Sequence, residues 1–191
     1  STLSNGTGTV AYQWQYSADN VTYSNVAAGT PGGTTYTNPT TTSMTVGGFS
    51  ANSTYYYRLS ATVSGSGCTS PVYSTGTSVQ VVSDPSLSAA SRTNSIICAG
   101  GTSVYSSSLS NGTGTFSYQW QYSPDNTNWS NVTTSTPAGA AYTNPTSTTM
   151  TVGGITAAST YYYRLSAITN GNGCTSPIFS LMKSGRACAS K

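Results

Sequence analysis

The clearest alternation of hydrophobic and polar side chains runs through residues 116–122, Phe-Ser-Tyr-Gln-Trp-Gln-Tyr. Every second side chain is aromatic and those between are polar, a period of two that is typical of a β-strand with one buried face. The same strand recurs at residues 10–16, Val-Ala-Tyr-Gln-Trp-Gln-Tyr. Because an indole ring buries a large apolar area, we predict that Trp14 and Trp120 anchor two hydrophobic cores.

The two strands belong to a duplication with an offset of 106 residues. Residues 4–73 and 110–179 are identical at 47 of 70 positions, without insertion or deletion. Self-similarity of this length indicates a repeated structural unit, so we expect one fold for both copies.

Short alternating stretches separated by turn residues fill both copies, which is the pattern of a β-sandwich. The longest stretches cover residues 54–63 and 160–168, and a Tyr near the start of each suits a tyrosine corner. Asn-Gly pairs at 5–6 and 111–112 mark tight turns before the central strands. We therefore predict an all-β protein of two tandem antiparallel β-sandwiches. Repeat 1 covers residues 1–83, and repeat 2, with a C-terminal tail, covers residues 84–191.

The second copy has an opening segment that the first copy lacks. Residues 95–109 hold the run Ile-Ile-Cys at 96–98 and an expected strand at 104–109, and the counterparts of residues 95–106 would fall before Ser1. We therefore expect repeat 1 to lack its opening strand. A sandwich without that strand exposes an unpaired edge, which either aggregates or binds another strand.

Composition excludes several classes of function. Ser and Thr number 34 each among 191 residues, nine residues are charged, and the chain has no His and no Glu. General acid–base catalysis relies on His or paired carboxylates. The three Asp residues fall in separate turns and in the linker, so we predict no enzyme, no metal site and no cofactor. The net charge of +3 is scattered, so no nucleic-acid partner is expected. No apolar run reaches the ~20 residues of a membrane helix, so we expect no membrane insertion.

Four cysteines, Cys68, Cys98, Cys174 and Cys188, occur without a zinc-binding spacing. Because Cys98 opens the second copy and Cys174 follows its long strand, we predict a structural disulfide between them, which requires an oxidising compartment. Cys68 then lacks an upstream partner within its own copy. The tail at 186–190, Arg-Ala-Cys-Ala-Ser, is similar to Ile-Ile-Cys-Ala-Gly at 96–100.

Three arrangements account for the two remaining cysteines. In the first, a C-terminal strand donated by one chain fills repeat 1 of the next, and Cys188 forms an inter-subunit link with Cys68. Such head-to-tail contacts build an open filament, a homo-polymer. In the second, the chain is a fragment of a longer array. In the third, Cys68 and Cys188 bond within one chain.

The motifs together resemble the immunoglobulin-like repeats of large secreted Bacteroidota cell-surface proteins of the gliding and adhesion type. The resemblance rests on Ile-Cys-Ala-Gly-Gly at 97–101, the central strand with its preceding turn at 111–123, Ser-Thr-Tyr-Tyr-Tyr-Arg-Leu at 159–165, and Gly-Asn-Gly-Cys-Thr-Ser-Pro at 171–177. It implies immunoglobulin-like folds and export to the bacterial cell surface by the type IX route. Repeat 1 departs from the pattern because it lacks the opening Cys strand.

The resemblance leaves the role open, because such modules serve as stalks, fibres and adhesive arms. We expect an extracellular structural protein, a subunit of a surface filament or adhesive stalk assembled head to tail through strand donation. The alternative is a glycan-binding accessory module, or a fragment of a longer adhesin array. Sugars stack on exposed aromatic rings, and Tyr23 and Trp129 are the candidate stacking residues for surface glycans. Outward aromatic rings also stabilise cross-strand pairs or pack against a neighbouring subunit.

Overall fold

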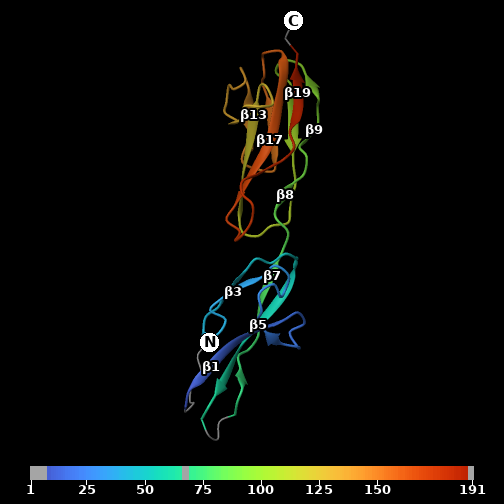
Figure 1. The fold of residues 1–191 in the computed structure, drawn as a ribbon. Helices are drawn as coiled ribbons and strands as arrows, with labels where there is room; N and C mark the ends of the chain where they lie inside the picture. The colour runs from blue at the N-terminus through green and yellow to red at the C-terminus, as the bar shows by residue number, and fades with distance from the viewer. Residues whose placement is uncertain (1–7, 66–68, 189–191) are drawn as a thin grey trace. The chain divides into compact units, whose positions relative to one another are not determined.

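A computed structural model describes residues 8–65 and 69–188. All regular secondary structure in these residues is β-strand, which confirms the predicted all-β class. The chain divides into two compact units, Ser1–Val82 and Ser83–Lys191, which we call module 1 and module 2. Figure 1 shows the strands of each module. The division lies one residue before the boundary predicted from the duplication.

Module 1 consists of one sheet and a separate hairpin. Its strands are β1 (Val10–Ser17), β2 (Ser24–Asn25), β3 (Thr35–Thr37), β4 (Thr45–Gly47), β5 (Ser53–Val63), β6 (Val72–Tyr73) and β7 (Thr77–Val81). The sheet has the order β2-β1-β5-β6, and β7 also pairs with β5. The hairpin is formed by β3 and β4.

In the part of the chain that the structure describes, module 2 has the same elements as module 1 and five more strands at its start. The additional strands are β8 (Ser86–Leu87), β9 (Ser91–Arg92), β10 (Ile96–Ile97), β11 (Thr102–Ser106) and β12 (Leu109–Ser110). The shared strands are β13 (Phe116–Ser123), β14 (Ser130–Asn131), β15 (Ala141–Thr143), β16 (Thr149–Gly153), β17 (Ser159–Thr169), β18 (Ile178–Phe179) and β19 (Lys183–Ala187).

The additional strands complete a second sheet in module 2. One sheet has the order β10-β19-β17-β13-β14, with β18 also on β17. The other has the order β15-β16-β11-β9, and β8 pairs with β12. The hydrophobic core includes Trp120, Met150 and Leu165, each 0% exposed. Two sheets around such a core, antiparallel except for the parallel pair β10–β19, agree with the predicted sandwich.

The predicted central strands occupy equivalent places in the two modules. β1 pairs antiparallel with β5 from Val10↔Val63 to Ser17↔Tyr56, and β13 pairs with β17 from Phe116↔Thr169 to Ser123↔Tyr162. The Trp120 indole N–H donates to the Ser147 carbonyl at 2.9 Å, so burial of this ring leaves no donor without a partner.

Two local predictions are confirmed by backbone geometry. Tyr161 Oη donates to the Ala157 carbonyl at 2.9 Å, four residues upstream, which is the predicted tyrosine corner. Asn111 and Gly112 have φ of 60° and 78°, as a tight turn with two left-handed residues requires. The equivalent turn at residues 5–6 lies outside the described residues.

Candidate functional site

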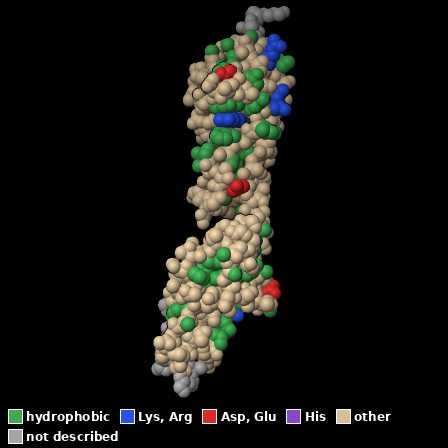
Figure 2. All heavy atoms as spheres, in the orientation of Figure 1, with side chains coloured by type: hydrophobic (Ala, Val, Ile, Leu, Met, Phe, Trp, Pro, Cys, Tyr) green, Lys and Arg blue, Asp and Glu red, His purple; other side chains and the backbone are tan. Residues whose placement is uncertain are grey.

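Asp125 and Asp84 accept hydrogen bonds from backbone and hydroxyl groups of module 2. Asp125 Oδ1 accepts the backbone N–H groups of Thr127 and Asn128, both at 2.8 Å. Asp84 accepts the backbone N–H and the hydroxyl of Thr175 at 3.1 and 2.8 Å. Residues 8–65 and 69–188 contain no group of three or more metal-ligating side chains. On the face drawn in Figure 2, charged side chains are few and lie apart. In the described part of the chain, no helix is long and apolar enough to span a membrane.

Module 1 differs most from module 2 at two strand edges. In module 2, the equivalent edges are each paired with a further strand. In module 2, β16 pairs with β15 on one side and with β11 on the other. Likewise, β19 pairs with β17 and β10. In module 1, β4 pairs with β3 and β7 pairs with β5, and no strand of the described residues occupies the other edge of either. We call these two edges together the acceptor groove.

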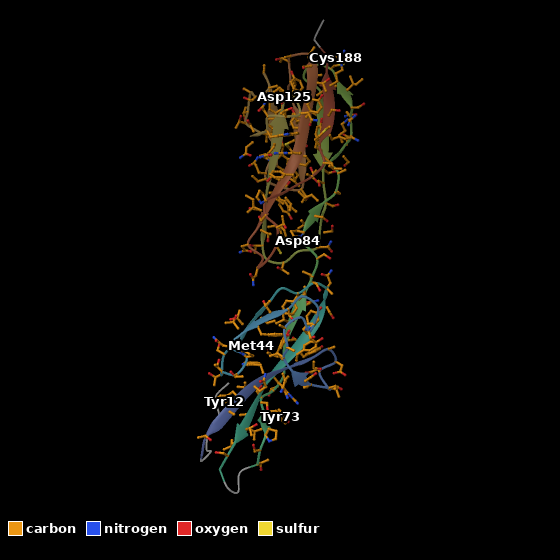
Figure 3. All side chains as sticks on the ribbon, viewed as in Figure 1. Tyr12, Met44, Tyr73, Asp84, Asp125 and Cys188 are labelled. Atoms are coloured by element: carbon orange, nitrogen blue, oxygen red, sulfur yellow. The ribbon has the colours of Figure 1, made fainter. Side chains whose placement is uncertain are left out.

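In the residues that the structure describes, the core of module 1 is partly open beside these edges. Trp120 is 0% exposed, whereas its counterpart Trp14 is only half-buried. Met150 is also fully buried, whereas Met44 is half-buried. Figure 3 labels Met44 in module 1. The predicted anchor is therefore confirmed at Trp120 and is incomplete at Trp14, because nothing described in module 1 replaces β11.

Tyr105 of β11 is the residue that closes the core of module 2. It is 1% exposed, and its ring centroid lies 4.7 Å from that of Tyr163 and 6.2 Å from that of Trp120. Its hydroxyl lies against Gly185, so closely that a Cβ at residue 185 would overlap it. Module 2 therefore accepts a Tyr at this position because residue 185 has no side chain.

Module 1 has a larger residue at the equivalent of Gly185. The offset of 106 places Val79 there, and the register agrees, because Gly185 pairs with Tyr161 and Val79 pairs with Tyr55. Val79 is 36% exposed, since no strand of the described residues covers it. By this register, the Val79 side chain corresponds to the position where a Cβ would overlap the Tyr105 hydroxyl in module 2. A Tyr seated on module 1 as Tyr105 is in module 2 would therefore meet Val79. Comparing the copies reveals the difference in residue type, but only the structure shows what that residue contacts.

The predicted disulfide between Cys98 and Cys174 is wrong in this structure, where Cys98, Cys174 and Cys188 are all free thiols. Cys98 follows β10, which lies beside the end of β19, and Ala187 of β19 pairs with Ser159 at the start of β17. Cys174 lies beyond the other end of β17, next to the Thr175 that binds Asp84. A strand of this length spans about 30 Å, whereas a disulfide requires Cα atoms within about 7 Å.

Figure 3 shows the two ends of module 2, with Cys188 at one and Asp84 at the other. The predicted inter-subunit partner of Cys188, Cys68, lies outside the described residues. The predicted donation of a C-terminal strand stays a prediction. Residues Lys183–Ala187 form β19 and pair with five residues of β17 in their own module, so donating them would require breaking these pairs.

The two candidate sugar-stacking residues lie in aromatic–arginine stacks. The Arg58 guanidinium lies 4.1 Å from the ring centroid of Tyr23 and 4.0 Å from that of Tyr73. In module 2, Arg164 lies 4.4 Å from the Trp129 centroid and 4.2 Å from the Phe179 centroid. An arginine therefore covers one face of each candidate ring, which leaves at most the other face for a sugar.

We expect the Arg164 stack to stabilise module 2. Its Nε donates to Gln121 Oε1 at 2.8 Å, which holds the guanidinium between the two rings. Because a Lys ammonium lacks this planar geometry, Arg164→Lys should lower the free energy of unfolding by about 1–2 kcal/mol. Urea denaturation followed by circular dichroism measures the loss. Lys183→Arg, at an exposed position, is the control, and an equal effect of both substitutions would contradict the role of the stack.

Comparisons with known proteins give no relative for this chain: no protein-family model matches it, and no curated protein is similar enough to count as a match. The resemblance to bacterial cell-surface repeats therefore remains a prediction from the motifs. The acceptor groove of module 1 is the candidate functional site that the geometry supports best.

Proposed function

We propose that the chain is an extracellular structural protein, a subunit of a surface filament or adhesive stalk. In this proposal, module 1 is completed by a strand from a neighbouring molecule. The observation that carries the proposal is the acceptor groove, where β4 and β7 each have one edge without a described partner beside a half-buried Trp14. Exposed backbone at a sheet edge binds an added strand through main-chain hydrogen bonds. Immunoglobulin-like modules exported to the bacterial surface agree with the hydroxyl-rich composition of the chain.

Module 2 shows how a completing strand would be seated. β11 runs antiparallel to β16 with Tyr105 opposite Met150, so the donated residue opposite Met44 would point towards Trp14 and Tyr57. Val79 limits the length of that residue. The donated strand therefore carries a side chain smaller than Tyr at this position, such as Leu.

This size limit has a consequence for assembly. The strand at residues 102–106 carries Tyr105, and in this proposal the Tyr side chain is too long to fit against Val79 in the acceptor groove. A second copy of module 2 would therefore not insert β11 into module 1. Such selection by steric exclusion keeps the strand of one module from entering the other. The donor is also a segment other than β19, which is paired within its own module.

Synthetic peptides test the proposal directly. One peptide carries residues 100–110 unchanged, and the second is identical except for Tyr105→Leu. We expect the Leu peptide to bind the 191-residue protein at least tenfold more tightly, because a difference of about 1.4 kcal/mol corresponds to tenfold. Binding is measured by calorimetry and by a blue shift of tryptophan fluorescence in a Trp129→Phe background, where Trp120 is already fully buried and Trp14 is half-buried.

The matched control is Val79→Gly, which recreates the residue present at 185 in module 2. This variant should bind the Tyr peptide as tightly as the original protein binds the Leu peptide. Equal binding of both peptides to both proteins would show that Val79 does not select the donor. If neither peptide binds either protein, the proposal that module 1 accepts a donated strand is wrong.

Negative-stain electron microscopy tests assembly itself. Because β11 and β19 are excluded as donors in this proposal, we expect filaments when the chain carries the Leu peptide as a C-terminal extension, and an excess of free Leu peptide should shorten them. Single particles under all conditions would contradict a filament subunit, whatever the peptides do.

A further inference from the structure

Cys98 and Cys188 are the residues directly after the neighbouring strands β10 and β19. β10 and β19 run parallel with Ile96↔Arg186 and Ile97↔Ala187 as partners. The ladder continues one step further, because the Cys188 N–H donates to the Ile97 carbonyl at 2.9 Å. The residue that follows β10 is Cys98, whose carbonyl accepts the Gly101 N–H at 2.8 Å in a turn. The two cysteines, 90 positions apart in sequence, are therefore adjacent across the ladder.

Strand alternation places both thiols on the same face. Ala187 is 1% exposed, and Ile97 packs against the core of module 2. The residues that follow them point to the opposite side, away from the core. Cys98 is exposed and Cys188 is half-buried, as this alternation requires. Neighbouring strands lie about 4.8 Å apart, a separation within the Cα range that a disulfide needs.

We propose that Cys98 and Cys188 form a disulfide that fastens β10 to β19. The bond arises by exchange with a small-molecule disulfide such as oxidised glutathione. One cysteine thiolate attacks that disulfide and releases one glutathione thiol. The second cysteine then displaces the other glutathione from the mixed disulfide. The two cysteines lose two protons and two electrons, and the glutathione disulfide gains them.

The bond would act where module 2 is weakly held. β10 contributes two registered pairs to its sheet, and it leads through the turn at residues 98–101 into β11, which carries Tyr105. Fastening β10 therefore holds the start of the strand that closes the core. The proposal is independent of strand donation, and it directs Cys188 to a partner in its own module instead of to Cys68 of a neighbour.

Trypsin separates the four cysteines, so peptide mapping identifies the pairing. Cleavage after Arg58, Arg92, Arg164, Lys183 and Arg186 leaves each cysteine on its own peptide: Cys68 on 59–92, Cys98 on 93–164, Cys174 on 165–183 and Cys188 on 187–191. After equilibration with oxidised glutathione and alkylation of free thiols, we expect 93–164 linked to 187–191. Cys174 should be alkylated. A link from 187–191 to 59–92, or alkylation of Cys98 and Cys188, would overturn the proposal.

Melting temperature tests the effect on the fold. A closed loop of this length should raise the melting temperature of module 2 by roughly 10 °C over the reduced protein. Cys98→Ser and Cys188→Ser should each abolish this difference. Cys174→Ser should preserve it, because Cys174 lies at the other end of the module. Equal melting of the oxidised and reduced protein, with the linked peptides present, would show that the bond does not fasten β10.

Discussion

Replacing Trp120 with Ala should lower the free energy of unfolding of module 2 by about 3–5 kcal/mol, the range for large aromatic truncations in a core. Trp120 is 0% exposed, it packs against Tyr105, and its indole N–H has a carbonyl partner. The equivalent Trp14→Ala should cost clearly less in the isolated chain. Trp14 makes the same type of hydrogen bond, to the Thr41 carbonyl at 2.9 Å, but it is only half-buried.

The duplication makes each Trp the matched control for the other, because the two occupy identical sequence, Tyr-Gln-Trp-Gln-Tyr. Guanidinium denaturation followed by fluorescence and circular dichroism gives both free energies. Addition of the Leu peptide should raise the cost of Trp14→Ala towards that of Trp120→Ala. Equal costs without peptide would mean that module 1 already has a complete core.

Alkaline pH should unfold the protein through its buried tyrosines. Burial raises the pKa of Tyr105 to about 12, and desolvation raises the pKa of Tyr163 further. In the unfolded chain these hydroxyls ionise near pH 10. Their neutral form therefore stabilises the native state below pH 10, and this contribution is lost as the pH rises towards 12. For Tyr105 alone the shift corresponds to on the order of 3 kcal/mol.

At acidic pH, stability is lost through carboxyl groups whose pKa is lowered in the native state, not raised. Backbone N–H groups of Thr22 and Val21, with the Ser17 hydroxyl, lower the pKa of Asp19 to about 2. The pKa of Asp125 is lowered by the equivalent turn, chiefly by the Asn128 N–H. Their contributions are present above the unfolded pKa near 4 and disappear as the pH falls through the folded values.

With neither His nor Glu in the chain, we expect a flat stability plateau between about pH 5 and pH 9. Thermal melts of cysteine-alkylated protein from pH 2 to pH 12 measure it. Tyr105→Phe keeps the ring and removes the ionisable group, so it should reduce the loss between pH 10 and pH 12. An unchanged alkaline slope in this variant would contradict the role of Tyr105.

The candidate site shows which predictions needed only local sequence. The correspondence between the two modules follows from the duplication, because one copy can be compared with the other position by position. The polar turn at Asp125 and the tyrosine corner at Tyr161 are local too, since each bond joins residues a few positions apart. The aromatic–arginine stacks were not predicted. Arg164 and Trp129 are 35 positions apart, and only pairing of the strands between them places one over the other.

The cysteines show the limit of local reasoning. Their order in the copy predicted Cys98 with Cys174, whereas parallel pairing of β10 with β19 brings Cys98 beside Cys188. The same holds for Val79, whose size becomes meaningful only where Gly185 touches Tyr105.

By itself, the sequence determined the all-β class, the duplication, the central strands and their turns. These depend on a period of two and on backbone preferences of single residues, which act over a few positions. Only the tertiary structure decided which edges have partners, which cysteines are neighbours and which residue lies opposite Tyr105. These depend on register between strands that are far apart in sequence, and a register shift of one residue reverses every side chain.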